Sequence, residues 1–178
     1  MDTGTSSSDG ESSSSGGGAP LTGEELFLES CSPCHGVEGE GTMLAYAIQH
    51  PLRDYSRWVV RNGRPQGTKF PGAVMLPFGE DKLADAELEL IFDYLDSFPQ
   101  PADGQGLFMD YCRNCHGVDA AGGVVQTDIR DELDEALEKV REGEGNDPGD
   151  RTGYMPLFSE ERLSDEEVAA IVEFVGGL

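Results

Sequence analysis

Basic residues are scarce in this chain of 178 residues, which carries 12 Lys and Arg against 35 Asp and Glu and so has a formal charge of −23. A surface of this sign repels phosphate backbones and anionic lipids, which excludes most nucleic-acid and membrane-surface binding. It suits docking to a protein partner with a basic face. It equally suits plain solubility or a saline habitat, and the sequence leaves both interpretations open.

Long apolar runs are also missing. No stretch approaches the ~18 apolar residues of a membrane-crossing helix, and Met1 is followed by Asp2 rather than by the basic and apolar regions of a signal peptide. Residues 1–20 are rich in Ser and Gly and contain three acids. This composition predicts a disordered tether. We interpret it as a spacer downstream of a lipid anchor or transmembrane segment, with a plain disordered tail as the alternative.

Cysteine is also scarce. The chain has four cysteines, and all of them lie in two copies of the pattern C-x-x-C-H. The copies are Cys31-Ser-Pro-Cys34-His35 and Cys112-Arg-Asn-Cys115-His116. The pattern is the attachment signature for c-type haem. Two cysteines one helical turn apart share a face, so both sulfurs can bond one porphyrin while the following histidine ligates its iron. The sequence therefore predicts two covalently attached haem c groups, with His35 and His116 as iron ligands.

Other uses of four cysteines fit less well. Zinc ribbons separate their cysteine pairs by roughly 15–20 residues, whereas Cys34 and Cys112 are 78 apart (112 − 34). A thioredoxin-like motif is expected within a βαβ pattern, which the sequence does not show. Structural disulfides agree with the cysteine count. None of the three explains a histidine directly after both pairs.

The chain also repeats itself, with an offset of 80 or 81 residues (140 − 60; 112 − 31). The repeated segments outside the cysteine motifs are 23–27 with 104–108, 60–63 with 140–143, and 83–88 with 163–168. Prolines between the copies end the preceding helix. We predict a domain over 21–98, a linker over 99–103 and a domain over 104–178. Each would have a thin core by itself, which a buried porphyrin would enlarge.

Each copy is expected to be helical. A short helix runs into the cysteine motif, a middle helix follows over 56–62 or 131–142, and a last helix is amphipathic. The apolar positions of the last helices are Leu88, Ile91, Phe92 and Leu95, and Val168, Ile171, Val172 and Val175. Tyr94 and Phe174 occupy equivalent positions, and we expect them where the first and last helices cross. The fold class predicted is all-α.

Methionine is the predicted second iron ligand in each copy. Met75 and Met155 follow their histidines by 40 and 39 residues (75 − 35; 155 − 116), in Pro-containing loops just before the last helix. Thioether sulfur is a soft, neutral ligand that raises the reduction potential of haem iron. The competitors are Met43, Met109 and His50. Met43 and His50 have no equivalent in the other copy, and Met109 lies inside the helix leading into the second motif, on the wrong side of the ring. His50 precedes Pro51 and is expected in an extended loop.

These motifs resemble dihaem cytochromes c built from two class I-type cytochrome c domains, and the resemblance covers residues 21–178. It implies a tandem pair of small all-α domains, each wrapped around a haem c. It also implies a periplasmic or extracytoplasmic location and a mature chain whose targeting segment has been removed. A proline carbonyl is expected to hold the second nitrogen of the iron-ligating histidine. Pro51 is the candidate in the first copy, and the second copy needs a different carbonyl.

Arginines are the expected partners of the haem propionates, because buried carboxylates need donors. Arg61 and Arg141 share a repeat position and are the first candidates, with Trp58 Nε1 as a third. Arg53 and Arg57 continue a stripe from Arg61 along the same predicted helix, and we interpret these two as a solvated face paired with nearby acids.

The resulting functional hypothesis is a one-electron carrier with two haems, rather than an enzyme, whose partners are redox proteins with a basic docking face. Both motif histidines are used on iron, and no acid–base or nucleophilic constellation stands out. The alternatives are a cytochrome subunit of a larger dehydrogenase or oxidase complex, and a small dihaem enzyme. Dihaem peroxidases are much longer, and dihaem thiosulfate dehydrogenases often use an axial cysteine that this chain cannot spare.

Overall fold

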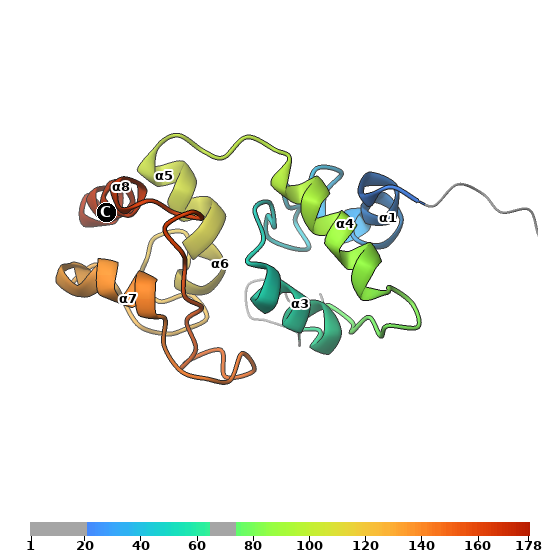
Figure 1. The fold of residues 1–178 in the computed structure, drawn as a ribbon. Helices are drawn as coiled ribbons and strands as arrows, with labels where there is room; N and C mark the ends of the chain where they lie inside the picture. Colours follow the sequence, from blue (N-terminus) through green and yellow to red (C-terminus); the bar gives the residue numbers. More distant parts are fainter. Residues whose placement is uncertain (1–20, 65–73) are drawn as a thin grey trace, which may run out of the picture.

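The computed structural model describes residues 21–64 and 74–178, which form helices joined by loops (Figure 1). The predicted tether over 1–20 lies outside the described residues. The helices are α1 (Gly23–Ser30), α2 (Ser32–His35), α3 (Arg53–Asn62), α4 (Asp85–Asp96), α5 (Gly104–Leu107), the π-helical turn η1 (Phe108–Cys112), α6 (Arg113–His116), the 3-10 turn η2 (Leu133–Glu135), α7 (Ala136–Glu142) and α8 (Asp165–Gly176). Extended pairing in this part is limited to two isolated bridges. The predicted all-helical architecture is confirmed.

Two sets of helices repeat the same packing, one in residues 21–98, called here the first half, and one in 104–178, the second half. In each, the helix that leads into the cysteine motif packs against the last helix, α1 on α4 and α5 on α8. A glycine lies at each crossing, because a Cβ on Gly23 would come within 1.9 Å of the Leu90 carbonyl oxygen, and one on Gly104 within 1.9 Å of the Ala170 carbonyl oxygen. The backbones of the crossing helices therefore touch.

The predicted aromatic contacts occur at these crossings. The rings of Phe27 and Tyr94 are centred 5.4 Å apart, and those of Phe108 and Phe174 are 5.6 Å apart. Phe27 and Phe108 are fully buried at the centres of the two cores. No helix in the described part of the chain is long and apolar enough to span a bilayer.

The middle helices differ from their predicted bounds. α3 starts at Arg53 rather than at 56, one turn earlier. Arg53 donates hydrogen bonds to three acids of α4, which holds this added turn in place. In the second half the predicted single helix over 131–142 is a 3-10 turn followed by α7, which begins at Ala136.

The two halves contact each other through the segment that precedes α3. His50 is 5% exposed, and its Nδ1 lies 2.5 Å from Asp110 Oδ2 while its Nε2 lies 2.9 Å from the Phe98 carbonyl oxygen. Its φ is +51°, so the expected extended conformation was wrong. Asn114 Nδ2 donates to the Ala47 carbonyl at 3.1 Å. Because protein acceptors engage both ring nitrogens of His50, this side chain fastens the halves together and is not placed to ligate iron.

A second group of contacts joins α4 to the loop before α8. Arg162 donates to Asp96 at 2.8 Å and to the Pro51 carbonyl at 3.3 Å. Asp96 also accepts a hydrogen bond from Arg53. Two arginines from different halves thus share one carboxylate, which fixes the end of α4 against the second half.

Candidate haem-binding sites

The two cysteine motifs have nearly the same backbone. Cys31 and Cys112 occupy the N-cap positions of α2 and α6, with φ of −118° and −109°. Each short helix ends in the motif histidine and is closed by a glycine with φ of +81°, Gly36 or Gly117. A residue with a side chain is strained in this left-handed region. The repeat therefore preserves the conformation of the motif as well as its residue types.

His35 has a hydrogen-bond partner that fixes its ring. Its Nδ1 lies 3.1 Å from the Tyr46 carbonyl oxygen, so Nδ1–H donates there and Nε2 is left for a metal. The expectation of Pro51 in this role was wrong. A turn in which Thr42 N donates to the Ala45 carbonyl brings Tyr46 back beside the motif. The Pro51 carbonyl instead faces the second half, where it accepts a hydrogen bond from Arg162.

The ring of His116 is not fixed in the same way. Its Nδ1 is buried and has no hydrogen-bond partner among the described residues. The carbonyl that the resemblance leads us to expect beside this histidine is therefore not found. Burial lowers the pKa of His116, and it also lowers the pKa of His35, where the Tyr46 carbonyl offsets part of the effect. Both imidazoles are thereby kept neutral, which is the form that binds a metal ion.

The two methionines are held in the same way. Met75 exchanges backbone hydrogen bonds with Arg64, at 2.8 and 3.1 Å, and Met155 does so with Glu144, at 2.8 and 2.9 Å. These are the two isolated bridges of the structure. The equivalence of Met75 and Met155, predicted from spacing alone, thus extends to the backbone that carries them.

A glycine at the end of each middle helix lets the methionine loop approach. Gly63 and Gly143 have φ of +72° and +68°, and a Cβ added to either would come within 2.4 or 2.6 Å of the methionine carbonyl oxygen. A side chain at these positions would push the loop away. The close approach accounts for the glycine of the repeated Val-Arg-x-Gly segment in the sequence.

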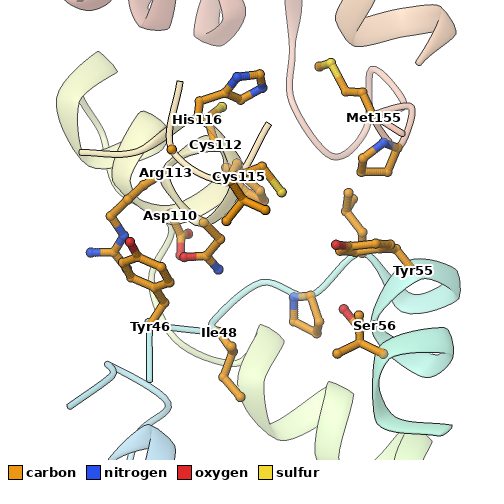
Figure 2. A pocket seen from close by; sticks show the side chains of 18 of the residues that line it. Tyr46, Ile48, Tyr55, Ser56, Asp110, Cys112, Arg113, Cys115, His116 and Met155 are labelled. Carbon is orange, nitrogen blue, oxygen red and sulfur yellow. The ribbon is translucent and has the colours of Figure 1, made fainter. Parts of the chain in front are cut away.

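Both cysteine motifs and both methionines line one cavity of about 1100 Å³, which extends across the two halves. Its remaining walls are mainly apolar, and they include Phe27, Val59, Leu88, Val124, Phe158 and Val168. Figure 2 shows the second-half portion, where His116 and Met155 lie on facing sides of the space and Cys112 and Cys115 lie below His116 in this view. Imidazole, thioether and paired thiols within apolar walls are the donors and surroundings that haem c requires, so the residues present fit two such groups.

The zinc alternative needs several donors at one point. Among the residues that the structure describes, no three His, Cys, Asp or Glu side chains converge in a way that could hold a metal ion. Burial raises the pKa of Cys31 to about 11 and that of Cys112 to about 12, so both are protonated thiols at neutral pH.

The arginines predicted to hold propionates have other contacts. Arg61 donates to the Phe78 carbonyl at 2.9 Å and to Asp85 at 2.5 Å. Arg141 donates to the equivalent carbonyl of Phe158 at 3.0 Å and to Asp165 at 2.6 Å. Each arginine thus ties the methionine loop to the start of the last helix, and neither lines the cavity. Their contact with propionates stays a prediction, as does that of Trp58, which also lies outside the cavity lining.

Arg53 and Arg57 behave as predicted for a paired helix face. Arg53 donates to Glu89, Asp93 and Asp96 at 2.7–2.9 Å, and Arg57 also contacts Glu89. The competitor Met43 is 93% exposed. Met109 packs against the second core from within η1.

Three arginines that do line the cavity were missed from sequence, namely Arg64, Arg113 and Arg151. Arg113 lies inside the second motif with its guanidinium 5.1 Å from the centre of the Tyr46 ring. Arg64 follows the glycine that ends α3, but its counterpart in the second half is Glu144. The repeat therefore offered no signal for these side chains.

Tyr55 and Arg64 of the first half also reach the second site. Tyr55 stacks on Tyr154, which precedes Met155, with ring centres 5.6 Å apart, and Arg64 donates to the Tyr55 hydroxyl at 2.6 Å. Burial raises the pKa of the Cys115 thiol, and Arg151 of the second half, followed by Arg64 and the Tyr55 hydroxyl of the first half, partly offsets that effect. The first half therefore supplies part of the wall around Cys115, where Figure 2 shows Tyr55 near Met155.

Comparison with known proteins adds the family. The chain matches the family described as cytochrome c oxidase, cbb3-type, subunit III, over residues 18–95 and again over 99–175. It is similar to the cbb3-type cytochrome c oxidase subunit FixP of Bradyrhizobium sp. (strain ORS 278), with 26% identity over 188 aligned positions that cover 90% of this chain and 61% of the relative. It is equally similar to subunit CcoP of Helicobacter pylori (strain 52), with 26% identity covering 88% of this chain and 57% of the relative. The chain thus spans about three fifths of the length of these relatives. It belongs to the cbb3-type cytochrome c oxidase subunit III family, as a tandem dihaem c-type cytochrome with two covalently attached haem c groups.

Proposed function

We propose that this chain is the electron-transferring dihaem part of a cbb3-type oxidase, in which it passes single electrons to the subunits that reduce oxygen. The observation that carries the proposal is the pair of matched His and Met positions facing one continuous cavity. The curated relatives are named as oxidase subunits, which favours a place in a complex over a free carrier. The chain itself then has no catalytic residues, because oxygen chemistry belongs to its partners.

In this proposal His35 and Met75 ligate one iron, and His116 and Met155 ligate the other, while Cys31, Cys34, Cys112 and Cys115 hold the two porphyrins. Haem c supplies a ferrous–ferric couple that carries one electron at a time. The neutral imidazoles are ready to bind iron, and the thioethers favour its reduced state. The glycine-ended middle helices and the Met bridges hold both thioethers at equivalent places.

We further propose that residues 21–98 and 104–178 are two haem domains joined by the linker 99–103. The contacts of His50, Asn114 and Arg162 would keep them at one separation, so that electron exchange between the sites does not depend on diffusion. A periplasmic location, with a membrane tether on the N-terminal side of residue 21, fits covalent haem attachment and the composition of residues 1–20.

Reconstitution tests the proposal. The haem-loaded chain is added to a purified cbb3-type oxidase from which the related subunit has been removed, and binding and oxygen consumption are both measured. We expect a stable complex and restored consumption. A chain that is fully haem-loaded yet neither binds nor restores consumption would refute the assignment.

A free carrier is the second candidate, and the charge of −23 favours it because charge steering speeds transient docking. Restored oxygen consumption without a stable complex, falling steeply as salt is raised, would select the carrier. Rapid peroxide reduction by the chain alone would instead identify a small dihaem enzyme.

A further inference from the structure

The outer faces of the two halves differ although the repeat relates them. At the offset of 80 (141 − 61), Arg61 corresponds to Arg141, and both bind an equivalent Phe carbonyl and an equivalent Asp. The two positions before it on the helix face do not match. Arg53 corresponds to Leu133, and Arg57 corresponds to Leu137.

In the first half this face is closed by charges. Arg53 and Arg57 both contact Glu89, and Arg53 also reaches Asp93 and Asp96 of α4. The guanidinium groups therefore lie across the seam between α3 and α4. A polar seam of this kind offers little apolar surface to a partner.

In the second half the same seam is open and apolar. Glu89 is replaced by Ala169 at the same offset (169 − 89). A groove of about 250 Å³ lies between η2 and α7 on one side and α8 on the other. It is lined by Leu133, Leu137, Val168, Ala169 and Val172, together with Asp134 and Asp165. Leu137 is 44% exposed. The groove is below the roughly 300–1,000 Å³ of small-molecule pockets, so it suits one or two side chains of a protein.

Charge decides which protein fits. Both polar residues that line the groove are acidic, and Asp134 makes the local charge negative even though Asp165 is paired with Arg141. Residues of the same sign, Asp131, Glu138 and Glu166, precede or follow the lining positions. A second copy of this chain also carries −23 and would be repelled. Residues 1–20 carry three acids and no large apolar residue after Met1, so they have neither the side chain nor the charge to fill the groove.

We propose that this groove binds an apolar side chain presented by a Lys- and Arg-rich segment of another oxidase subunit, so that the second half is the docking half of the molecule. The inference rests on the proposed function and names the surface through which the complex forms. The first half, whose equivalent seam is closed by arginines, does not dock in this way.

One double variant tests the groove without altering net charge. Leu137→Arg with Ala169→Glu installs in the second half the pair that Arg57 and Glu89 form in the first. Leu90→Ser is the control, because Leu90 is 42% exposed on α4 of the other half. Binding of each haem-loaded variant to the oxidase lacking its related subunit is measured by titration.

We expect the double variant to bind about tenfold more weakly, or about 1.4 kcal/mol, and Leu90→Ser to bind within about twofold of the wild type. Equal affinity of all three proteins would overturn the groove proposal while leaving the proposed function intact. Absence of binding by the wild type would refute the proposed function, and the named partner with it.

A second measurement does not need the oxidase. A synthetic helical peptide with leucines on one face and lysines on the other is titrated into the haem-loaded chain, and methyl NMR shifts are followed. We expect shifts at Leu133 and Leu137 that the double variant abolishes, and none with a Leu/Glu peptide. Shifts that are equally large at Leu90, or absent from the groove, would contradict the proposal.

Discussion

The two halves agree in the backbone that carries the haem site and differ in several of the side-chain contacts around it. The crossing glycines, the arginine that ties the methionine loop to the last helix, and the backbone bridge to the methionine are the same in both. The ring partner of the motif histidine, the residue opposite the methionine and the outer seam all differ. The repeat therefore preserves the backbone of the haem site more closely than the contacts around it.

The two halves also differ in the contacts that they make outside their own cores. The first half reaches across the interface with His50, Tyr55 and Arg64, and it closes its own outer seam with arginines. The second half reaches back with Asn114 and Arg162, but its own outer seam has an apolar groove. We interpret the second half as the one that meets partners.

Adding a side chain at the helix crossings should destabilise both halves equally, and we expect it to have the largest effect on stability. Gly104→Ala and Gly23→Ala each place a methyl group 1.9 Å from a carbonyl oxygen, so the helices must separate. We expect a loss of about 3 kcal/mol or more in the free energy of unfolding for either variant, measured by chemical denaturation. Gly177→Ala is the control, because its nearest neighbour is 3.4 Å away. Losses no larger than that of the control would show that the crossings are not this tight.

Removing His50 should separate the halves without disturbing either core. His50→Ala leaves Asp110 buried without its partner, and such a loss costs about 3 kcal/mol. We expect unfolding to change from one transition to two, monitored at each haem. Lys139→Ala is the control, since its ion pair with Glu144 is largely exposed and should contribute no more than about 0.5 kcal/mol. A single unshifted transition in His50→Ala would contradict the role of this residue at the interface.

Acid should loosen the same interface through Asp96. Burial raises the pKa of Asp96, but the hydrogen bonds from Arg162 and Arg53 outweigh burial, so the pKa lies below its usual value. The stabilisation is therefore present above about pH 4, the unfolded value, and is lost as the pH falls through the lower folded value. After solvent screening we expect about 1 kcal/mol at neutral pH, absent in Asp96→Asn. A difference between the two proteins that grows as the pH falls would contradict this sign.

The smallest effect is expected at the outer seams. Arg57→Ala removes a partly exposed pair with Glu89, which should cost about 0.5 kcal/mol and less at high salt. The equivalent Leu137→Ala should show no salt dependence, because it removes only apolar contact. Urea unfolding at low and high salt measures both. A loss above about 2 kcal/mol for Arg57→Ala would mean that the charged seam is part of the core.

The features that could be predicted from the sequence were those that occur in both copies of the repeat. Met75 and Met155, and the crossing aromatics Tyr94 and Phe174, stand at matching positions because matching backbones carry them. Amphipathic spacing also located α4 and α8. Residue type and periodicity carry this information directly.

Contacts that involve a backbone carbonyl or a distant segment left no such trace. A carbonyl acceptor has no residue signature, so the partner of His35 was assigned to Pro51 when it is Tyr46. His50 meets Asp110 and the Phe98 carbonyl, 60 and 48 residues away, and no local pattern encodes that. The shared position of Arg61 and Arg141 signalled a shared role, but the same residue type serves a carbonyl or a propionate.

The central claim is that each half holds its own iron between a histidine and a methionine. Met75→Ala and Met155→Ala, prepared separately with both haems attached, test it in a spectroscopic redox titration. Each variant is expected to lose half of the sulfur-to-iron charge-transfer band and to lower one of the two potentials by about 0.1 V or more, within the roughly 0.8 V that axial ligands span. A full band in either variant, or two potentials that move together, would contradict the account.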